Sequence, residues 1–163
     1  KILTEEVRQH SATFILCDSN TNEFCVRFLL ETIPALHEVP IIEIPAGEES
    51  KSLEIVAQLY EELLQHNADR QALLLNVGGG VVTDIGGFVA STYKRGIDFI
   101  NIPTTVMAQV DAAMGGKCGV DLLDVKNAVG LFSWPKSVLV FTGFLNQPPI
   151  WVPVLPAGKE MML

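Results

Sequence analysis

Side chains that could do chemistry are concentrated between residues 78 and 130. A triple glycine at residues 78–80 directly follows the apolar run 73–77. An apolar strand that passes through glycines into a helix presents free backbone N–H groups, and these bind phosphate groups. Polar and charged residues then recur at short intervals in an otherwise apolar stretch: Asp84, Arg95, Thr104, Thr105, Asp111, Lys117, Lys126 and Asn127. This block is typical of a site that holds a nucleotide beside a substrate.

Each of these features, taken singly, also has a structural explanation. The triple glycine suits a tight strand-to-helix turn, and it lacks the G-x-G-x-x-G spacing of the standard dinucleotide fingerprint. Asp84 is expected in the first turn of a helix, where the helix dipole stabilises an acid, and Thr104 suits a helix cap. Asp111 fits an ion pair as well as a functional role, and Lys117 and Lys126 fit a solvated surface. The functional interpretation therefore depends on the order of these residues within one segment.

The hydrophobic pattern predicts the elements that would position these residues. Apolar runs predict strands over residues 12–17, 39–44, 72–77, 97–102 and 137–141. Helical spacing predicts helices over residues 22–32, 52–66, 81–93 and 104–114, followed by a loop to residue 126. This alternation indicates an α/β fold with a Rossmann-like, mainly parallel sheet flanked by helices. Ligands of such sheets bind beyond the carboxyl ends of the strands, so one edge should carry Asp18, Glu48, Gly78 and Pro103.

Two of the predicted helices have a clear apolar face. In helix 52–66, the i, i+3, i+4, i+7 spacing selects Leu53, Val56, Ala57, Tyr60, Leu63 and Leu64. In helix 22–32, one side carries Phe24, Cys25, Phe28 and Leu29. We expect both faces to pack in the core, and Ser50 or Ser52 to cap the second helix.

The composition excludes several classes of protein. The chain has 163 residues, of which 48% are hydrophobic and 18% charged, which is enough for one folded domain. The net charge is −8, and residues 1–83 carry thirteen acidic and five basic side chains, so nucleic acid is a poor partner. No apolar run reaches the length of a membrane span. Three cysteines and three histidines are scattered, which argues against a zinc site built from this chain alone and favours reduced thiols in a cytoplasmic protein.

The two ends of the sequence suggest a piece of a longer protein. The N-terminal residues show no signal-peptide pattern. The first residue is not Met, so we expect the chain to start inside a longer one. Four prolines stand in residues 147–156. We therefore predict one α/β domain over residues 1–146, and a Pro-rich linker or the start of a truncated second domain over residues 147–163.

The ordered motifs closely resemble the 3-dehydroquinate synthase family. They are Gly-Gly-Gly-Val-Val-Thr-Asp at 78–84, Tyr-Lys-Arg-Gly at 93–96, Ile-Pro-Thr-Thr at 102–105, Gln-Val-Asp at 109–111, Gly-Gly-Lys at 115–117 and Lys-Asn at 126–127. Asp-Ser-Asn at 18–20 and Gly-Glu-Glu-Ser-Lys at 47–51 match further motifs of the family. The resemblance covers residues from about 12 to 146 and corresponds to the family's N-terminal, NAD-binding half.

The resemblance implies a phosphate-eliminating carbon–oxygen lyase of the shikimate pathway. The family converts DAHP, a seven-carbon sugar-acid phosphate, into 3-dehydroquinate and phosphate. NAD⁺ is reduced and reoxidised within one turnover, and a divalent metal, zinc or cobalt, polarises the reacting alcohol. The resemblance further implies a cytoplasmic homodimer.

The resemblance also implies a role for each matching position. Contacts to NAD are implied for Asp18, Asn20, Glu48, Lys51, Gly79, Gly80, Asp84, Thr104, Thr105 and Phe144. Substrate and active-centre residues are matched by Asp111, Lys117, Lys126 and Asn127. Arg95 resembles the arginine that reaches the substrate phosphate of the neighbouring subunit. Fixed cations of this kind suit a phosphate leaving group.

The sequence departs from the family pattern after residue 146. Gln-Pro-Pro at 147–149 replaces the family's threonine and leucine-proline-x-arginine-glutamate run, and Glu160 lies near the family's first metal ligand at altered spacing. The histidine ligands belong to a C-terminal helical domain, so this chain alone is expected to lack the metal site and the activity. Two alternatives stay open. One is another NAD-dependent sugar-phosphate cyclase, such as an inosose or valiolone synthase, and the other is a catalytically inactive nucleotide-binding module.

Overall fold

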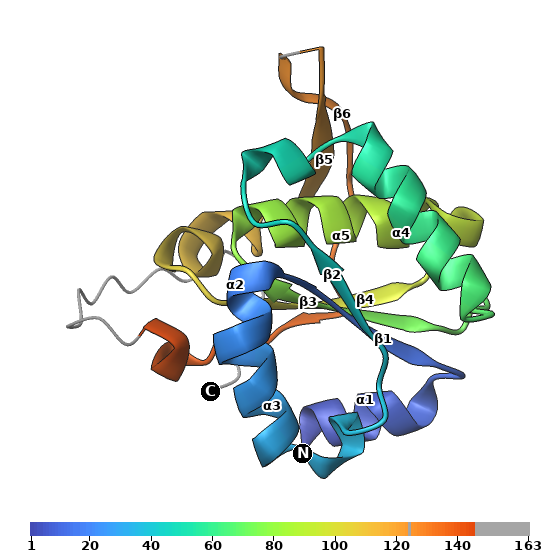
Figure 1. Cartoon of the computed structure of the whole chain (residues 1–163), viewed down its shortest axis with the longest axis vertical. Helices are drawn as coiled ribbons and strands as arrows, with labels where there is room; N and C mark the ends of the chain where they lie inside the picture. The colour runs from blue at the N-terminus through green and yellow to red at the C-terminus, as the bar shows by residue number, and fades with distance from the viewer. Residues whose placement is uncertain (124, 146–163) are drawn as a thin grey trace.

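A parallel five-stranded sheet forms the centre of the molecule (Figure 1). The computed structural model describes residues 1–123 and 125–145. The strands are β1 (Thr13–Asp18), β2 (Ile41–Ile44), β3 (Leu73–Gly78), β4 (Asp98–Pro103) and β7 (Ser137–Val138), in the order β2-β1-β3-β4-β7. All four strand pairings are parallel. The predicted α/β fold and the predicted strands are therefore confirmed, with boundaries shifted by one to three residues.

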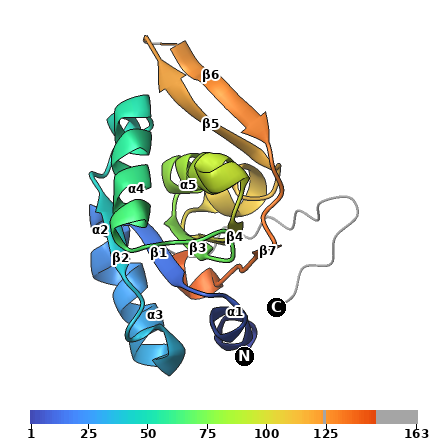
Figure 2. The same ribbon diagram turned by 90° about the vertical axis from the view of Figure 1, so that its right-hand side faces the viewer.

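Helices cover both faces of this sheet (Figure 2). One face packs against α1 (Ile2–Gln9) and α3 (Arg27–Thr32), and the other against α4 (Leu53–Gln65) and α5 (Gly80–Thr92). Neighbouring residues of a strand point to opposite faces, so Leu74 belongs to the α4–α5 core while Leu75 belongs to the α1–α3 core. In the described part of the chain, no helix has the length and apolar character needed to cross a bilayer.

The predicted loop between residues 115 and 126 is wrong, because a β-hairpin stands there. β5 (Lys117–Leu122) pairs antiparallel with β6 (Val125–Phe132), and the hairpin projects away from the central sheet (Figures 1 and 2). Most of β6 is exposed, so it lacks the apolar alternation on which strand prediction depends. Glycines face each other across the ladder at Gly119 and Gly130, which lets the two backbones approach closely.

The predicted helix 22–32 is interrupted, and its apolar face was only half right. It consists of α2 (Ser19–Thr21), a π-helical turn (Asn22–Val26) and α3. Cys25 and Leu29 are buried as expected, but Phe24 and Phe28 are 69% and 39% exposed. A π-helical turn adds a residue per turn, so it rotates the side chains that precede it relative to those that follow.

In α4, the buried face lies to one side of the predicted one. Val56, Leu59 and Leu63 are buried, whereas Leu53 and Leu64 are 37% and 55% exposed. Ser52 caps the helix, as expected, by accepting a hydrogen bond from the backbone N–H of Ile55 at 3.4 Å. The same spacing rule fits two overlapping apolar stripes here, and only contact with the sheet selects between them.

Short turns complete the described structure. The predicted helix 104–114 is reduced to residues 106–112, and Ala108–Ala112 within it form a second π-helical turn. Four 3₁₀ turns connect the main elements: Pro34–Leu36, Glu48–Ser50, Tyr93–Arg95 and Thr142–Leu145.

Candidate nucleotide and substrate site

The glycine turn between β3 and α5 forms the centre of the candidate site. Gly78 must lack a side chain, since a Cβ there would lie 2.5 Å from the Cβ of Val82. The N–H of Thr104 donates to the Gly78 carbonyl at 3.0 Å, which joins the turn to the segment after β4. Within residues 1–123 and 125–145, no side chain caps the start of α5. The first N–H groups of α5 have no partner inside the helix and are suited to hold an anion.

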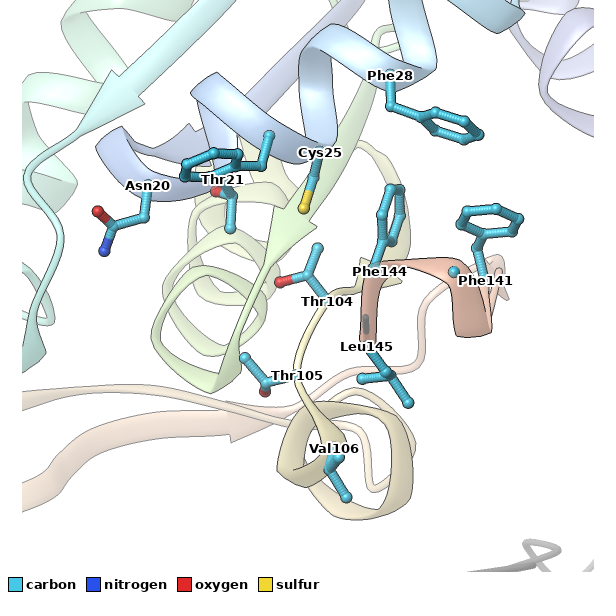
Figure 3. Close-up of a pocket in the computed structure, with 12 residues that line it drawn as sticks. Asn20, Thr21, Cys25, Phe28, Thr104, Thr105, Val106, Phe141, Phe144 and Leu145 are labelled. Carbon is cyan, nitrogen blue, oxygen red and sulfur yellow. The ribbon is translucent and has the colours of Figure 1, made fainter. Parts of the chain in front are cut away.

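A cavity of about 820 Å³ lies beside this turn (Figure 3). Its walls come from the segment after β1, the segment after β4 and the 3₁₀ turn Thr142–Leu145. Four of the residues predicted to contact NAD meet here: Asn20, Thr104, Thr105 and Phe144. The predicted Gly79 is close by, since a Cβ added to it would lie 3.3 Å from Cγ2 of Thr105. A Cβ added to Gly80 would lie 3.6 Å from Ala112, on the other side of the turn.

Three aromatic rings line one side of the cavity. Phe28 stacks on Phe141 with ring centroids 5.0 Å apart, and Phe144 meets Phe141 edge-on at 5.0 Å. The sulfur of Cys25 faces the same hollow in Figure 3, and burial raises the pKa of this thiol. A wall of this kind suits a flat apolar group with a few polar contacts. Sequence reasoning missed three of these lining residues, because Cys25 and Phe28 were assigned to the packed face of a helix and Phe141 to the end of a strand.

A second cluster is built around the buried Lys51, which is 5% exposed. Its Nζ donates to Oδ2 of Asp84 and to Oδ1 of Asn127, both at 2.6 Å. Asn127 sits in the left-handed region at φ 52°, and its backbone N–H donates to Oδ1 of Asp121 at 2.7 Å. The cluster therefore connects α5, the segment before α4 and the β5–β6 hairpin. It places Lys51 and Asp84, which are predicted NAD contacts, beside Asn127, which is a predicted active-centre residue.

The environment of Asp84 differs from the one expected. Asp84 is the fifth residue of α5, beyond its first turn, so stabilisation by the helix dipole is the wrong explanation. Burial raises the pKa of this carboxyl, and the nearby carboxylates of Glu48 and Asp111 act in the same direction. The hydrogen bond and charge of Lys51 oppose this rise. The negative charge of Asp84 is thus favoured by its contact with Lys51.

The remaining predicted residues surround these two groups. Lys126 forms an exposed ion pair with Glu48 at 3.2 Å. Asp111 and Lys117 are exposed, at the second π-helical turn and at the first residue of β5. Because Asp111 is exposed, its carboxylate does not need a structural ion pair, while its functional role stays a prediction. Asp111 and Lys117 are therefore accessible to a ligand from solvent. Lys126 and Glu48 are held by their surface ion pair.

Asp18 caps the short helix that lines the cavity, whereas Arg95 stands apart. The Asp18 side chain caps α2: its Oδ1 accepts from the N–H of Thr21 at 2.8 Å, and Thr21 Oγ1 accepts from the N–H of Asp18 at 3.0 Å. Arg95 is exposed at φ 72° after the C-terminal end of α5, at the opposite edge of the sheet from the glycine turn. The structure does not bring Arg95 together with the other predicted residues of the same chain.

The described residues offer no ready metal centre. Across residues 1–123 and 125–145, no three His, Cys, Asp or Glu side chains are placed to share an ion. The three cysteines are free and buried, and burial raises the pKa of Cys17 to about 12 and that of Cys118 to about 11. The predicted ligand Glu160 and the predicted linker 147–163 lie outside the described residues.

Comparison with known proteins bears on these assignments. Residues 41–150 match the family model described as 3-dehydroquinate synthase N-terminal. The 3-dehydroquinate synthase of Parabacteroides distasonis is 47% identical over 138 residues, which is 85% of this chain and 39% of that relative. The chain thus spans about two fifths of the length of the curated relatives it matches.

Two solved sugar-phosphate cyclases share the fold. A 2-deoxy-scyllo-inosose synthase complexed with carbaglucose-6-phosphate, NAD⁺ and Co²⁺ superposes with a TM-score of 0.76 at 28% identity, over 84% of this chain and 38% of that one. A 2-epi-5-epi-valiolone synthase from Streptomyces hygroscopicus, with NAD⁺ and Zn²⁺ bound, gives 0.74 at 33% identity, over 83% and 39%. The family model covers most of this chain, and the sequence identity to the named synthases is higher than to either cyclase. The chain belongs to the 3-dehydroquinate synthase family.

Proposed function

We propose that this chain supplies the nucleotide-binding half of a 3-dehydroquinate synthase. The enzyme would convert DAHP into 3-dehydroquinate and phosphate, as a phosphate-eliminating lyase. The observation that carries the proposal is the uncapped glycine turn of α5, with a cavity on one side and the Lys51 cluster on the other, in a chain of this family. A cytoplasmic location agrees with this role.

The glycine turn and the cavity fit NAD⁺. The start of α5 presents backbone N–H groups to a pyrophosphate, and Gly79 and Gly80 carry no side chain that would block its approach. The aromatic wall next to Thr104 and Thr105 suits one of the flat rings of the dinucleotide. When bound, NAD⁺ supplies reversible hydride transfer, which acidifies the proton next to the oxidised carbon so that phosphate can leave. The residues of this chain hold and orient the two molecules.

The polar side chains around the Lys51 cluster fit a phosphorylated sugar acid. We propose that Lys117 and Lys126 meet its negatively charged groups and that Asn127 and Asp111 orient its hydroxyl groups. We also propose that Arg95 serves the site of a neighbouring subunit in a homodimer, since it lies at the far edge of the sheet from the other residues.

A divalent metal would complete the site. The two cyclases named above hold Co²⁺ and Zn²⁺, respectively, together with NAD⁺. The described residues of this chain do not form a ligand set, so we propose that the ligands come from Glu160 and from the part of the family's length that this chain does not cover.

A chimera tests the proposed function directly. The aligned segment of the Parabacteroides distasonis synthase is replaced by the matching segment of this chain, and phosphate release from DAHP is measured with and without NAD⁺. We expect NAD⁺-dependent release, because the two segments are 47% identical and belong to one family. Lys117→Ala should reduce this release strongly, whereas Arg70→Ala, at an exposed position between α4 and β3, should leave it unchanged.

Two results would contradict the proposal. A chimera that folds and binds NAD⁺ but releases no phosphate from DAHP would remove the proposed reaction. A Lys117→Ala chimera with normal turnover would remove Lys117 from the active site. Circular dichroism of each variant separates a loss of chemistry from a loss of fold.

A further inference from the structure

Two asparagines face each other inside the central sheet, beneath the candidate site. Asn76 of β3 and Asn101 of β4 are neighbours in the strand register, and their residues are 0% and 4% exposed. Strands covered on both faces are normally apolar throughout, and a buried amide is costly unless it is hydrogen-bonded. Apolar side chains could fill these positions without that cost, so the presence of two buried amides needs a specific structural reason.

The hydrogen bonds fix the orientation of both amides. Asn101 Nδ2 donates to the carbonyl of Ala113 at 3.3 Å. A carbonyl only accepts, so Asn101 must present its Oδ1 to the other side, where Nδ2 of Asn76 donates to it at 2.9 Å. The pair therefore forms a directed chain from β3 through β4 to the end of the second π-helical turn.

The pair is also enclosed by α5. Oδ1 of Asn76 is buried and has no hydrogen-bond partner among the described residues. It lies against Gly86, where an added Cβ would be only 2.1 Å away. α5 thus carries a glycine in its middle where the amide pair sits, although glycine weakens a helix by roughly 1 kcal/mol relative to alanine. The strands β3 and β4 supply the two amides, and α5 supplies the glycine that leaves room for them.

The segment held by the pair carries predicted active-centre residues. Ala113 ends the turn Ala108–Ala112, which contains Asp111, and the chain continues through two glycines to Lys117. The backbone N–H of Ala113 donates to the Ala108 carbonyl at 3.0 Å, while its own carbonyl is held by Asn101. π-helical turns are rare and are frequent at functional sites, so contacts that hold such a turn are of interest for function.

We infer that Asn76 and Asn101 are positioning residues that fix the turn Ala108–Ala112 relative to the glycine turn of α5. Asn101 holds the C-terminal end of the turn Ala108–Ala112. Asn76 orients Asn101 and packs against α5, the helix that begins at the glycine turn. The distance between Asp111 and the nucleotide-binding N–H groups then depends on this amide pair. This inference rests on the proposed function, which assigns Asp111 to the substrate.

The double variant Asn76→Leu/Asn101→Leu separates positioning from stability. Replacing one amide leaves its partner buried and unpaired, whereas replacing both by apolar groups of similar shape can be nearly neutral for stability. In the double variant the Ala113 carbonyl loses its donor, but the buried, unpartnered Oδ1 of Asn76 is removed as well. Because these two effects oppose each other, we expect the full chain to unfold at a urea concentration close to that of the wild type. We expect hydrogen exchange at the amides of Ala113, Met114 and Gly115 to be roughly 5- to 10-fold faster, the equivalent of one lost hydrogen bond.

Activity gives the second readout, in the chimera described above. The double variant should lower kcat by roughly 10- to 100-fold, the usual effect of a misplaced catalytic group, with little change in NAD⁺ affinity. Thr13→Val is the matched control, since Thr13 is also a buried polar residue of the sheet with an unpartnered Oγ1 among the described residues. It should change neither the exchange at residues 113–115 nor kcat.

The outcomes are distinct. Wild-type exchange at residues 113–115 together with wild-type kcat in the double variant would overturn the inference. Uniformly faster exchange along the whole chain would also overturn it, because the pair would then serve only overall stability. An inactive wild-type chimera would contradict the proposed function instead, while the exchange measurement on the chain itself would still decide whether the amide pair holds the turn.

Discussion

Lys51 shows how much the chemistry of this site depends on single side chains. It is buried, and its ammonium group is shared between a carboxylate on α5 and an amide on the hairpin. The sequence predicted Lys51, Asp84 and Asn127 as site residues but not their contact. Lys51 and Asn127 are separated by 76 positions, and the hairpin that joins them was not predicted.

Lys51→Met should destabilise the chain by about 3 kcal/mol, because Asp84 would be left partly buried without a cation. The loss should shrink at acidic pH. Burial already raises the pKa of Asp84, and removal of Lys51 raises it further, so the folded variant binds a proton more readily than the unfolded one. Its free energy of unfolding therefore increases as the pH falls through that raised pKa toward the ordinary pKa of an unfolded aspartate, about 3.9. Urea titrations at several pH values measure this dependence.

Lys126→Met is the matched lysine control for this experiment. Its ion pair with Glu48 is exposed, and such pairs contribute about 0–1 kcal/mol. A Lys51→Met variant whose loss of stability is the same at neutral and acidic pH would show that Asp84 does not need the charge of Lys51.

At the scale of elements, the β5–β6 hairpin carries three of the predicted active-centre residues. They are Lys117, Lys126 and Asn127. The alternation of strands and helices predicted the central sheet because those strands are long apolar runs. The hairpin and the two π-helical turns were missed for a physical reason. Their conformation is set by contacts with distant parts of the chain, and exposed strands and short helical turns leave little hydrophobic periodicity.

Gly130→Ala should open the hairpin while leaving the central sheet intact. A Cβ at this position would lie 2.5 Å from the backbone oxygen of Cys118 on the opposite strand, and such crowding costs about 1–3 kcal/mol. We expect faster hydrogen exchange across residues 117–132, with far-ultraviolet circular dichroism almost unchanged. Ala128→Ser, at an exposed position of the same strand, should exchange like the wild type. Unchanged exchange in Gly130→Ala would show that the strands can separate without cost.

For the whole molecule, the glycine turn and the cavity lie at the carboxyl edge of the sheet, where the parallel topology places a ligand site. The glycine turn, the segment after β4 and the segment after β1 meet there because parallel strands end on the same side. The sequence could not predict which side chains share the cavity and which join the Lys51 cluster. That division depends on side-chain packing across three segments.

NAD⁺ should bind the chain alone more weakly than it binds the chimera. The chain offers the glycine turn and one cavity wall, while the chimera adds the remaining three fifths of the relative's length. At a concentration 100 times the dissociation constant, bound NAD⁺ would stabilise either protein by about 2.7 kcal/mol. Calorimetric titration of both proteins under the same conditions measures the difference. Equal affinities would show that the chain carries the complete NAD⁺ site.

The strand order also determines how this protein must fold. β3 lies between β1 and β4, and its pairing with β1 joins residues about sixty positions apart, as in Thr13 with Leu73. Contacts of such long range make folding slow, because the chain must lose much of its entropy before they form. The glycine turn lies at the end of β3, so the N–H groups proposed to bind phosphate are fixed by the pairing of β3 with a strand on each side. A ligand of this turn would therefore favour the fully folded chain over partly folded forms.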